Sequence, residues 1–376
     1  MRFHSKLEVD LSVLQENFQL LRSLAPSNET IFMIKANGYG HGLLEMAQYS
    51  HFELGVGAFG VASLGEAIKI RTELPSLEAD IYVFSDTGLY DAELRRLYLD
   101  YNVVPVIGCF EDLKDFLLDK EFSHVPLILK IDTGMNRLGL GTEELEDAAA
   151  LLKDFGRRSV HHLMTHFSSS FLKSKPGDRT QKQYENFRQA KSLLQSFGIA
   201  VEKTSCSNSG AIEQGIGLEE SHIRPGLMLY GPGSLGAWKG KNISSLKTRV
   251  INSFMIKKGA PVGYGGHVCH KDGLLVYLPL GYGDGFLTYY SKLDINVEGR
   301  SARVLGRVNM DLCALLFEPD CAEMFKRGEE VALWRRDQTG VSRLAADANT
   351  VPYQIFTSIS SRVPRFYTAK FNAVVE

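Results

Sequence analysis

The sequence predicts an α/β fold, in which an N-terminal TIM (β/α)8 barrel is followed by a mostly β C-terminal domain. Up to about residue 235, short β-prone runs alternate with amphipathic helical patterns. Beyond that point short strands with turn glycines dominate, and helix-forming stretches nearly vanish. At 376 residues the chain also exceeds the usual size of one hydrophobic core, so two domains are expected.

The barrel region begins with a predicted helix. Asp10 suits its N-cap, and Leu11, Leu14, Phe18 and Leu21 follow at helical spacing. Eight strands are predicted after it, because eight β-prone runs alternate with helical segments. The predicted strands lie near 31–35, 58–63, 79–86, 102–108, 125–132, 160–167, 202–208 and 222–230, with helical segments such as 142–155 and 182–197.

The second domain is predicted to follow a glycine-rich linker at 231–242. Its short apolar runs alternate with polar residues and are separated by glycines, which is typical of antiparallel β structure. The candidate strands are TRVINSFMI, LLVYLPLG, INVEG, ARVLGRV and EEVALWR, and a helical pattern returns only at PYQIFTSIS. We therefore expect a barrel at 1–235 and a β domain at 236–376.

Composition excludes several classes of function. The net charge is −2 with no dominant basic patch, which argues against nucleic acid as a partner and favours a small-molecule enzyme. The five cysteines are scattered without CxxC spacing, which suits a reducing cytoplasm. No apolar run reaches the ~18 residues of a membrane span, and the amino terminus has no signal-peptide core. We expect a cytoplasmic protein without membrane contact.

Lys35 is the most informative candidate. It closes the apolar run IFMI and precedes the segment NGYGHG. Most lysines are exposed or snorkel to solvent, but one at the end of a buried strand is partly desolvated, which lowers its pKa and favours an imine with an aldehyde cofactor. Glycines after it would let backbone amides approach an anion, and a helix start at Leu43 would point there. An imine-forming lysine beside a phosphate cradle suggests pyridoxal phosphate.

Other chemistry-bearing residues fall at predicted strand ends. Besides Lys35, these are Asp132, His166 and Asn208. The carboxyl ends of barrel strands carry the active sites of TIM barrels. His161 and His162 lie near His166, but no carboxylate or cysteine completes a metal site, so structural or stacking roles are favoured and no metal is expected.

The chain resembles the alanine racemases through most of its length. The shared motifs are LEVD (7–10), IKANGYGHG (34–42), KIDTGMNRLGL (130–140), MTHF (164–167), SNSGA (207–211), RPGLMLYG (224–231), VGYGG (262–266), LPLGYGDGF (278–286), GRVNMD (306–311), and PYQI with RVPRFY (352–367). The resemblance implies a pyridoxal-phosphate enzyme that interconverts L-alanine and D-alanine and supplies D-alanine for peptidoglycan.

Racemisation needs an acid/base group on each face of a planar carbanion. The resemblance implies that Lys35 serves one face and Tyr264 the other, with the tyrosine delivered by the partner subunit of a homodimer. A free tyrosine has a pKa of about 10, so its surroundings must tune it. Without the resemblance, an aromatic plug over a hairpin is the simpler interpretation of Tyr264.

The resemblance also assigns cofactor contacts. Arg224 would face the pyridine nitrogen, and His166 would lie near the ring and link Arg224 to the second base. Arginine keeps its proton and can only donate, which leaves that nitrogen unprotonated and suits racemisation; a rim arginine paired with a carboxylate is the alternative. The phosphate would be held by Tyr39, Ser209, the amides of Gly226 and Leu227, and Tyr353.

For the substrate, the resemblance implies that Arg137 and the backbone of Met310 hold the carboxylate. A fork-shaped guanidinium suits that planar anion. Lys130 matches a lysine that is often carbamylated in the family and orients the arginine. Tyr282 and Tyr353 match aromatic residues that would limit the substrate side chain to about a methyl group. Pocket size discriminates by only about 1 to 3 kcal/mol per methylene, so serine or 2-aminobutyrate would also enter.

Several residues depart from the family pattern and concern substrate preference, the loop after His166 and the subunit interface. They are Asn37 and Gly38, Asn136, Ser168 to Phe171, Asn309 and Gln354. None of these departures removes a base or the cofactor lysine. Three alternatives to an alanine racemase remain open. One is a racemase for serine or another amino acid. The second is a non-catalytic pyridoxal-phosphate carrier, which would need neither the β domain nor the tyrosine. The third is a decarboxylase of similar architecture.

Overall fold

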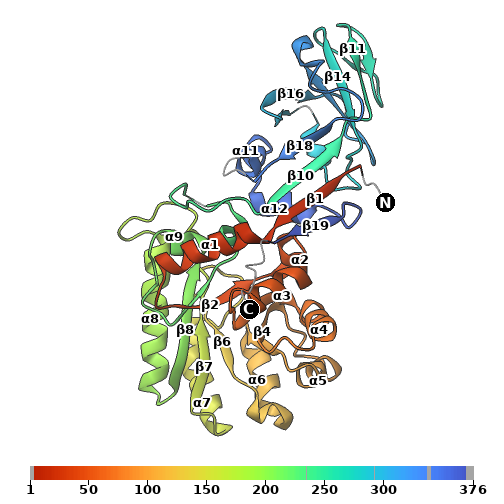
Figure 1. The fold of residues 1–376 in the computed structure, drawn as a ribbon. Coiled ribbons are helices and arrows are strands. Elements are labelled where there is room, and N and C mark those ends of the chain that lie inside the picture. The colour runs from red at the N-terminus through yellow and green to blue at the C-terminus, as the bar shows by residue number, and fades with distance from the viewer. Residues whose placement is uncertain (1–3, 234, 292, 337–339, 370–376) are drawn as a thin grey trace, which may run out of the picture.

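The computed structural model describes residues 4–233, 235–291, 293–336 and 340–369. Figure 1 shows a barrel ringed by helices, with an elongated, mostly β part extending away from one end of it. The predicted fold class is therefore confirmed. No described helix combines the length and the apolar character that a membrane span requires. Among the same residues, no group of three or more His, Cys, Asp or Glu side chains is arranged to hold a metal ion.

A closed ring of eight parallel strands forms the barrel, and each strand overlaps one of the predicted runs. The strands are β2 (Glu29–Met33), β3 (Ala58–Ser63), β4 (Asp80–Asp86), β5 (Val104–Ile107), β6 (Ile128–Lys130), β7 (Ser159–Met164), β8 (Ala200–Asn208) and β9 (His222–Arg224). The predicted eighth strand was too long. It ends at Arg224 because Pro225 has no N–H for a ladder, and the chain then turns into a short helix.

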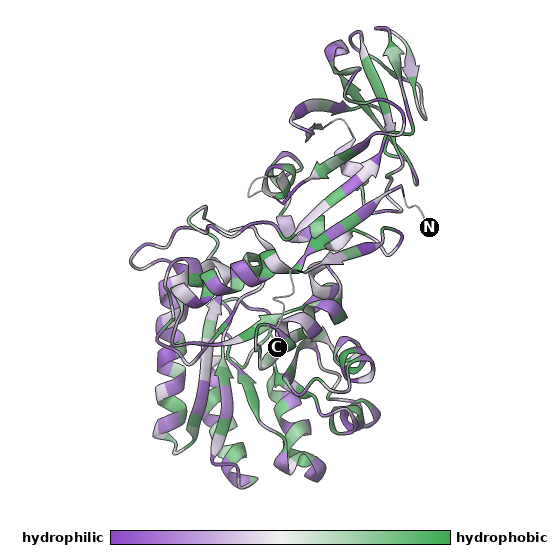
Figure 2. Ribbon diagram, viewed as in Figure 1, coloured by the Kyte–Doolittle hydropathy of each residue, from purple (hydrophilic) through white to green (hydrophobic). Residues whose placement is uncertain are grey.

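Helices separate the barrel strands. They are α1 (Leu11–Leu24), α2 (Lys35–Tyr39), α3 (Leu43–Phe52), α4 (Leu64–Glu73), α5 (Ala92–Asp100), α6 (Phe110–Leu118), α7 (Leu145–Asp154), α8 (Arg179–Ser196), α9 (Ser209–Glu213) and α10 (Leu227–Tyr230). The predicted N-cap of α1 is confirmed, since the Asp10 carboxylate accepts from the Ser12 amide at 3.0 Å. Helix α8 is mainly hydrophilic in Figure 2, and its buried residues, among them Tyr184, Phe187 and Leu194, recur at helical spacing.

The β part contains two larger sheets and a hairpin. One sheet has the order β18-β10-β1-β19, the other β11-β14-β17-β16-β15, and β12 pairs with β13. Their bounds are β1 (Lys6–Asp10), β10 (Ser244–Arg249), β11 (Asn252–Ile256), β12 (Pro261–Val262), β13 (His267–Val268), β14 (Gly273–Leu278), β15 (Asp294–Val297), β16 (Arg300–Val304), β17 (Cys313–Phe317), β18 (Glu330–Trp334) and β19 (Arg365–Thr368); helices α11 (Gly340–Asp347) and α12 (Pro352–Ser358) accompany them.

Strand β1 joins the amino terminus to this second part of the molecule. It pairs antiparallel with β10 and parallel with β19, although it precedes the whole barrel in sequence. Backbone pairing of β1 with β10 and β19 therefore crosses the predicted domain boundary at residue 235. The boundary itself stays a prediction. Asn17 of α1 also binds the carbonyl and amide of Lys241, which fixes the end of the predicted linker against the barrel.

One continuous apolar core runs from the barrel into the sheet that holds β1. It includes Ile34 and Phe59 in the barrel and Leu7, Leu246 and Trp334 in the sheet. A smaller core, with Leu275 and Leu316, lies in the outer sheet. The shared core holds the barrel and the β1 sheet together, because separating them would expose buried apolar area to water.

Candidate active site

A cavity of about 510 Å³ opens at the carboxyl ends of the barrel strands. Most predicted site residues line it: Lys35, Tyr39, Lys130, Arg137, His166, Ser209, Arg224, Gly226, Leu227 and Tyr353. Tyr353 comes from α12, whereas the others end or follow barrel strands. The location agrees with the rule that TIM barrels carry their sites on this face.

Lys35 follows β2 and enters a left-handed turn. Ala36, Asn37 and Tyr39 have φ of 53°, 56° and 52°, a region that residues other than glycine seldom adopt. The Glu66 carboxylate holds this turn, because it accepts from the Asn37 amide at 3.1 Å and the Ala62 amide at 2.9 Å. The turn ends the strand and leaves Lys35 facing the cavity. Such strain persists where surrounding contacts over-determine it, and it concentrates at functional sites.

The glycines after Lys35 do not form the expected anion cradle. The amides of Gly38, Gly40 and Gly42 donate to carbonyls inside the turn, at 2.7 to 2.9 Å. Two of the glycines serve close packing instead. A Cβ on Gly40 would lie 2.1 Å from the Phe356 carbonyl oxygen. One on Gly42 would lie 2.0 Å from the Tyr367 hydroxyl. The expected helix start at Leu43 is confirmed. The Leu43 amide, however, donates to Asn37 Oδ1 at 3.0 Å and not to an anion in the cavity.

Other backbone amides and hydroxyls that line the cavity are candidates for binding an anion. Helices α9 and α10 begin there, and Ser209 Oγ accepts from the amides of Gly226 at 3.0 Å and Met228 at 3.3 Å. A Cβ on Gly226 would lie 2.5 Å from the Tyr39 hydroxyl oxygen, so the two groups are close. Burial raises the pKa of Tyr39 above its ordinary value and that of Tyr353 to about 12, so both hydroxyls keep their protons and remain donors.

Four cationic side chains converge on the cavity: Lys35, Lys130, Arg137 and Arg224. The lining, all of which is described, contains no aspartate or glutamate. Asp132 is nearby, but its carboxylate accepts from the backbone amides of Gly134, Met135 and Arg137 at 2.8 to 3.0 Å. The cavity is therefore electropositive and suits an anionic ligand.

The pKa values of the two lysines reflect this environment. Burial, followed by the charge of Arg137, lowers the pKa of Lys35, which increases the fraction of neutral, nucleophilic amine. Lys130 is only 6% exposed. Burial and the charges of Arg137, Arg224 and Lys35 lower its pKa to about 8.

Arg224 is almost completely buried, and the structure shows no carboxylate partner for it among the described residues. Its guanidinium donates to Ser205 Oγ, to the Thr165 carbonyl and, at 3.4 Å, to the Cys206 carbonyl. Burial lowers its pKa to about 10, so it remains a cation near neutral pH. The alternative of a carboxylate-paired rim arginine is therefore wrong.

His166 lies in the same cluster. Burial and the charges of Arg224 and Lys130 lower its pKa well below the ordinary value, so its imidazole is neutral. Within the described chain it forms no hydrogen bond with Arg224, whose observed hydrogen bonds go to Ser205, Thr165 and Cys206. The expected link between these two residues is thus not formed within one chain.

Three predicted residues lie outside the cavity, on the surface of the β part. Tyr264 sits in the β12–β13 turn and is 73% exposed. It does not plug the hairpin. Tyr282 and Met310 are 46% and 52% exposed, and backbone bonds from Tyr282 to Asn309 (2.9 Å) and from Gly283 to Met310 (2.9 Å) bring them together. One chain alone therefore leaves its cavity without the predicted tyrosine.

Two positioning features were missed by sequence reasoning. Glu66 was visible only as part of the S-x-x-E pattern that starts α4, and the structure uses its carboxylate on the turn after Lys35. Ser205 was one polar residue in a strand, yet it receives a hydrogen bond from Arg224. Asn136, one of the departures from the family pattern, has φ of 57°, a left-handed conformation that asparagine tolerates.

Sequence comparisons cover nearly the whole chain. The profile "Alanine racemase, N-terminal domain" matches residues 9–233, and "Alanine racemase, C-terminal domain" matches residues 243–367. An alanine racemase from Carboxydothermus hydrogenoformans is 33% identical over 96% of this chain and 98% of its own length. One from Pseudomonas syringae is 30% identical over 96% and 98%.

Solved structures give the same pattern. The biosynthetic alanine racemase from Pseudomonas aeruginosa has a TM-score of 0.82 and 28% identity, over 98% of this chain and all (100%) of that one. An alanine racemase from Bartonella henselae with covalently bound pyridoxal phosphate shares the fold, with a TM-score of 0.84 and 23% identity over 98% and 100%.

Proposed function

This chain belongs to the alanine racemase family, and from that membership we propose that it interconverts L-alanine and D-alanine with pyridoxal 5'-phosphate bound to Lys35. The observation that carries the proposal is the cavity in which a lysine of lowered pKa meets three further cations and no carboxylate. Such a cavity suits a phosphorylated aldehyde and a carboxylate substrate together.

The donor set fits the cofactor. Lys35 supplies the amine for its aldehyde, and Arg224 is the donor for its pyridine nitrogen. The neutral hydroxyls of Tyr39, Ser209 and Tyr353, with the amide of Leu227 at the start of α10, suit a phosphate dianion. When bound, the cofactor delocalises the electron pair that is left when the α-proton is removed.

The chain's own residues then move the proton. Lys35 Nζ takes or returns it on one face of the α-carbon, and Tyr264 Oη does so on the other. Because Tyr264 is exposed and outside its own chain's cavity, we assign this role to the partner's Tyr264 in a homodimer. Arg137 lines the cavity and would hold the substrate carboxylate, together with the backbone of Met310 and beside Tyr282 from the same partner surface.

Lys130 is proposed as the site of a carbamate. A pKa of about 8 leaves part of its amine neutral near physiological pH, and only the neutral amine attacks CO2. The neutral amine and CO2 give a carbamate anion and one proton, so a side chain that is cationic when protonated becomes anionic. It would then accept hydrogen bonds from Arg137 and reduce the positive charge of the cavity.

The experiment that tests the function is a chiral assay of each L-amino acid with purified protein and cofactor. D-alanine as the dominant product supports the proposal. D-serine or the D-form of another amino acid as the dominant product would identify a different racemase. Cofactor binding without turnover would identify a carrier, and release of CO2 a decarboxylase.

The biological role would be D-alanine supply for peptidoglycan in the cytoplasm. Expression in a bacterium that requires added D-alanine should remove that requirement, whereas continued dependence would contradict the role even if the purified protein racemises alanine.

A further inference from the structure

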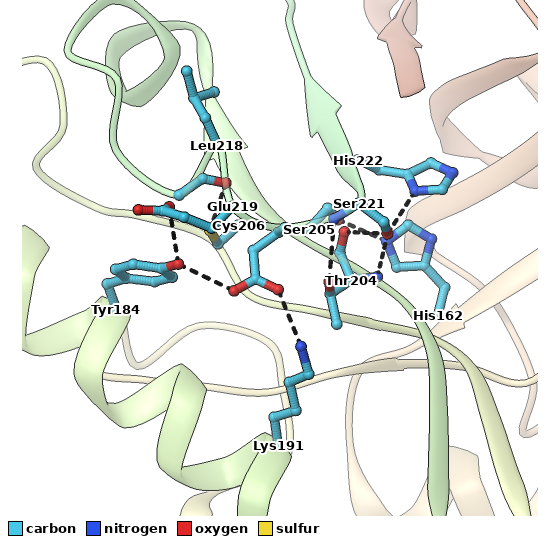
Figure 3. Close-up of polar contacts among 12 residues, drawn as sticks. His162, Tyr184, Lys191, Thr204, Ser205, Cys206, Leu218, Glu219, Ser221 and His222 are labelled. Atoms are coloured by element: carbon cyan, nitrogen blue, oxygen red, sulfur yellow. Dashed lines mark hydrogen bonds and ion pairs between the residues drawn. The ribbon is translucent and has the colours of Figure 1, made fainter. Parts of the chain in front are cut away.

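A chain of hydrogen bonds extends from Arg224 into the barrel interior, away from the cavity. Arg224 Nη1 donates to Ser205 Oγ on β8, and Ser205 Oγ lies 2.8 Å from His162 Nε2 on β7. Ser205 and His162 are both completely buried. Figure 3 shows these two residues among their polar neighbours, with Ser221 and His222 alongside. Ser205 is thus placed between the arginine and a buried histidine.

The direction of each bond follows from the donors available. A guanidinium only donates, so Ser205 Oγ must accept from it. The hydroxyl proton of Ser205 is then free to point at His162 Nε2. In that arrangement Nε2 accepts the proton and the neutral ring carries its own proton on Nδ1. That Nδ1 has no hydrogen-bond partner in the described chain.

The surroundings of His162 favour this state. Its ring contacts His222 edge-on, with centroids 4.9 Å apart, and Tyr82 at 6.3 Å. Burial, followed by the charges of His222 and Arg224, lowers the pKa of His162 well below its ordinary value. A protonated ring would instead offer Nε2–H to Ser205, and the hydroxyl proton of Ser205 would lose this acceptor. The neutral ring is the form that can accept the Ser205 proton.

We propose that His162 is a positioning residue for Arg224, which acts by fixing the hydroxyl of Ser205 so that its lone pair faces the guanidinium. The Nδ1–H without a hydrogen-bond partner is the local cost of this arrangement. Neither the shared motifs nor the cavity lining includes His162. Its effect on the reaction rests on the proposed function, in which Arg224 faces the cofactor nitrogen.

Three variants test the inference. His162→Leu removes the acceptor at similar size, His162→Gln restores an acceptor through its amide oxygen, and Ser205→Ala removes the bridge. His222→Gln is the matched control, since this neighbouring buried histidine bonds Ser221 and not Ser205. For each, we would measure pyridoxal-phosphate affinity, kcat and KM for alanine, the absorbance of the bound cofactor against pH, and urea unfolding without cofactor.

We expect His162→Leu and Ser205→Ala each to weaken cofactor binding and lower kcat by roughly 3- to 10-fold, the size of one lost hydrogen bond, with KM for alanine nearly unchanged. The pH dependence of the cofactor absorbance should shift in both. His162→Gln should recover most of the loss. The double variant should be no worse than Ser205→Ala alone, because both act through one bond.

Additive effects of the two substitutions, or wild-type behaviour of His162→Leu, would overturn the inference. If His162→Leu fails to fold, Ser205→Ala and His162→Gln still decide it. Ring ¹⁵N chemical shifts of the cofactor-free protein supply a separate readout: His162 should show an unprotonated Nε2, and a protonated one would be contradictory. Wild-type protein that neither binds the cofactor nor racemises alanine would instead refute the proposed function. The nitrogen shifts would still report on the hydrogen bond between Ser205 and His162.

Discussion

At the scale of single residues, burial decides what the cationic side chains of the cavity do. Lys35 and Lys130 have lowered pKa values, whereas Arg224 keeps its charge in spite of complete burial. The difference lies in the groups themselves, because an amine loses its proton far more readily than a guanidinium. One fold thereby provides both nucleophilic amines and a permanent cation within a single cavity.

Lys35 should carry the cofactor. Wild-type protein with pyridoxal phosphate should absorb visible light, and borohydride should reduce the imine and attach the cofactor permanently to Lys35. The lowered pKa of Lys35 and its position at the cavity favour this imine. Peptide mass analysis identifies the modified residue. Lys257→Ala, at an 83% exposed side chain, is the control and should label normally. A label on another lysine would refute the assignment.

Tyr264→Phe should reduce racemisation by about 10²- to 10⁴-fold, as is typical when a general acid/base is lost. Lys35 remains, so α-proton exchange of one alanine enantiomer with deuterated solvent should persist. Mass spectrometry of each enantiomer measures it. Tyr90→Phe alters a tyrosine of similar exposure, 79% against 73%, and should have no effect. Full racemase activity in Tyr264→Phe would exclude the tyrosine as a base.

Lys130 should destabilise the protein in the absence of ligands. Folding lowers its pKa from 10.5 to about 8, so the unfolded chain binds more protons between these values and stability should rise with pH there. Below about pH 8 the cost is full, about 3 kcal/mol. In cofactor-free, CO2-free buffer, Lys130→Met should therefore be more stable than wild type at pH 7, by urea unfolding.

That advantage should shrink as pH approaches 10.5. Lys182→Met, at an exposed position of α8, serves as the control and should change stability little. A Lys130→Met protein that is less stable than wild type at pH 7 would show that the lysine is paired with an anion in the folded chain.

At the scale of elements, the sequence predicted the strands better than the turns between them. Short β-prone runs marked all eight barrel strands, and a fully buried one such as VPVI of β5 is apolar throughout because both faces of a parallel sheet are covered. The predictions for the end of the eighth strand and for the role of the glycines after Lys35 were wrong. Both depend on contacts with distant segments, such as Phe356 and Tyr367 against Gly40 and Gly42, which local pattern does not contain.

The candidate site was predictable to the same degree. Residues at strand ends met in one cavity because the barrel brings all strand ends together. Glu66 and Ser205 were not found, because a carboxylate on a helix and a serine in a strand have no distinguishing local signal. Only the register between neighbouring strands and turns gives them partners.

The left-handed turn after Lys35 should depend on Glu66. Glu66→Gln replaces a carboxylate that accepts two backbone amides, and hydrogen bonds to charged groups contribute about 1.5 to 3 kcal/mol. We expect lower stability of the cofactor-free protein by urea unfolding and weaker cofactor binding, because Lys35 begins this turn. Glu73→Gln, at the exposed end of the same helix, should change neither. Equal effects of the two substitutions would contradict this role.

At the scale of the whole molecule, the two predicted bases of one chain do not meet in one site. Lys35 lines the cavity of the barrel, whereas Tyr264 lies on the β part. The barrel and the β1 sheet share a core, so their relative orientation is fixed by packing. The β11 and β14 strands lie at the end of the molecule distant from the barrel in Figure 1. Tyr264 follows β11 and is absent from the cavity lining. A second copy is the simplest source of this side chain.

Complementation between two inactive chains tests that arrangement. Lys35→Ala and Tyr264→Ala should each be inactive as homodimers, because every site then lacks one base. In a heterodimer of the two, one site receives both defects and the other receives an intact Lys35 from one chain and an intact Tyr264 from the other. Activity should therefore return, to about half the wild-type value per dimer, since general acid/base residues act within hydrogen-bond reach of the proton they transfer.

The heterodimer would be purified through two different tags and assayed for D-alanine. A heterodimer of Lys35→Ala with Tyr90→Phe is the matched control, and its one intact Lys35 site should give the same activity. If the test heterodimer binds cofactor but stays as inactive as its parents while this control is active, Tyr264 does not act across the subunit boundary. Either it is not a base at all, or it acts in the cavity of its own chain, which its exposed position in the β12–β13 turn does not allow without a rearrangement of the β part.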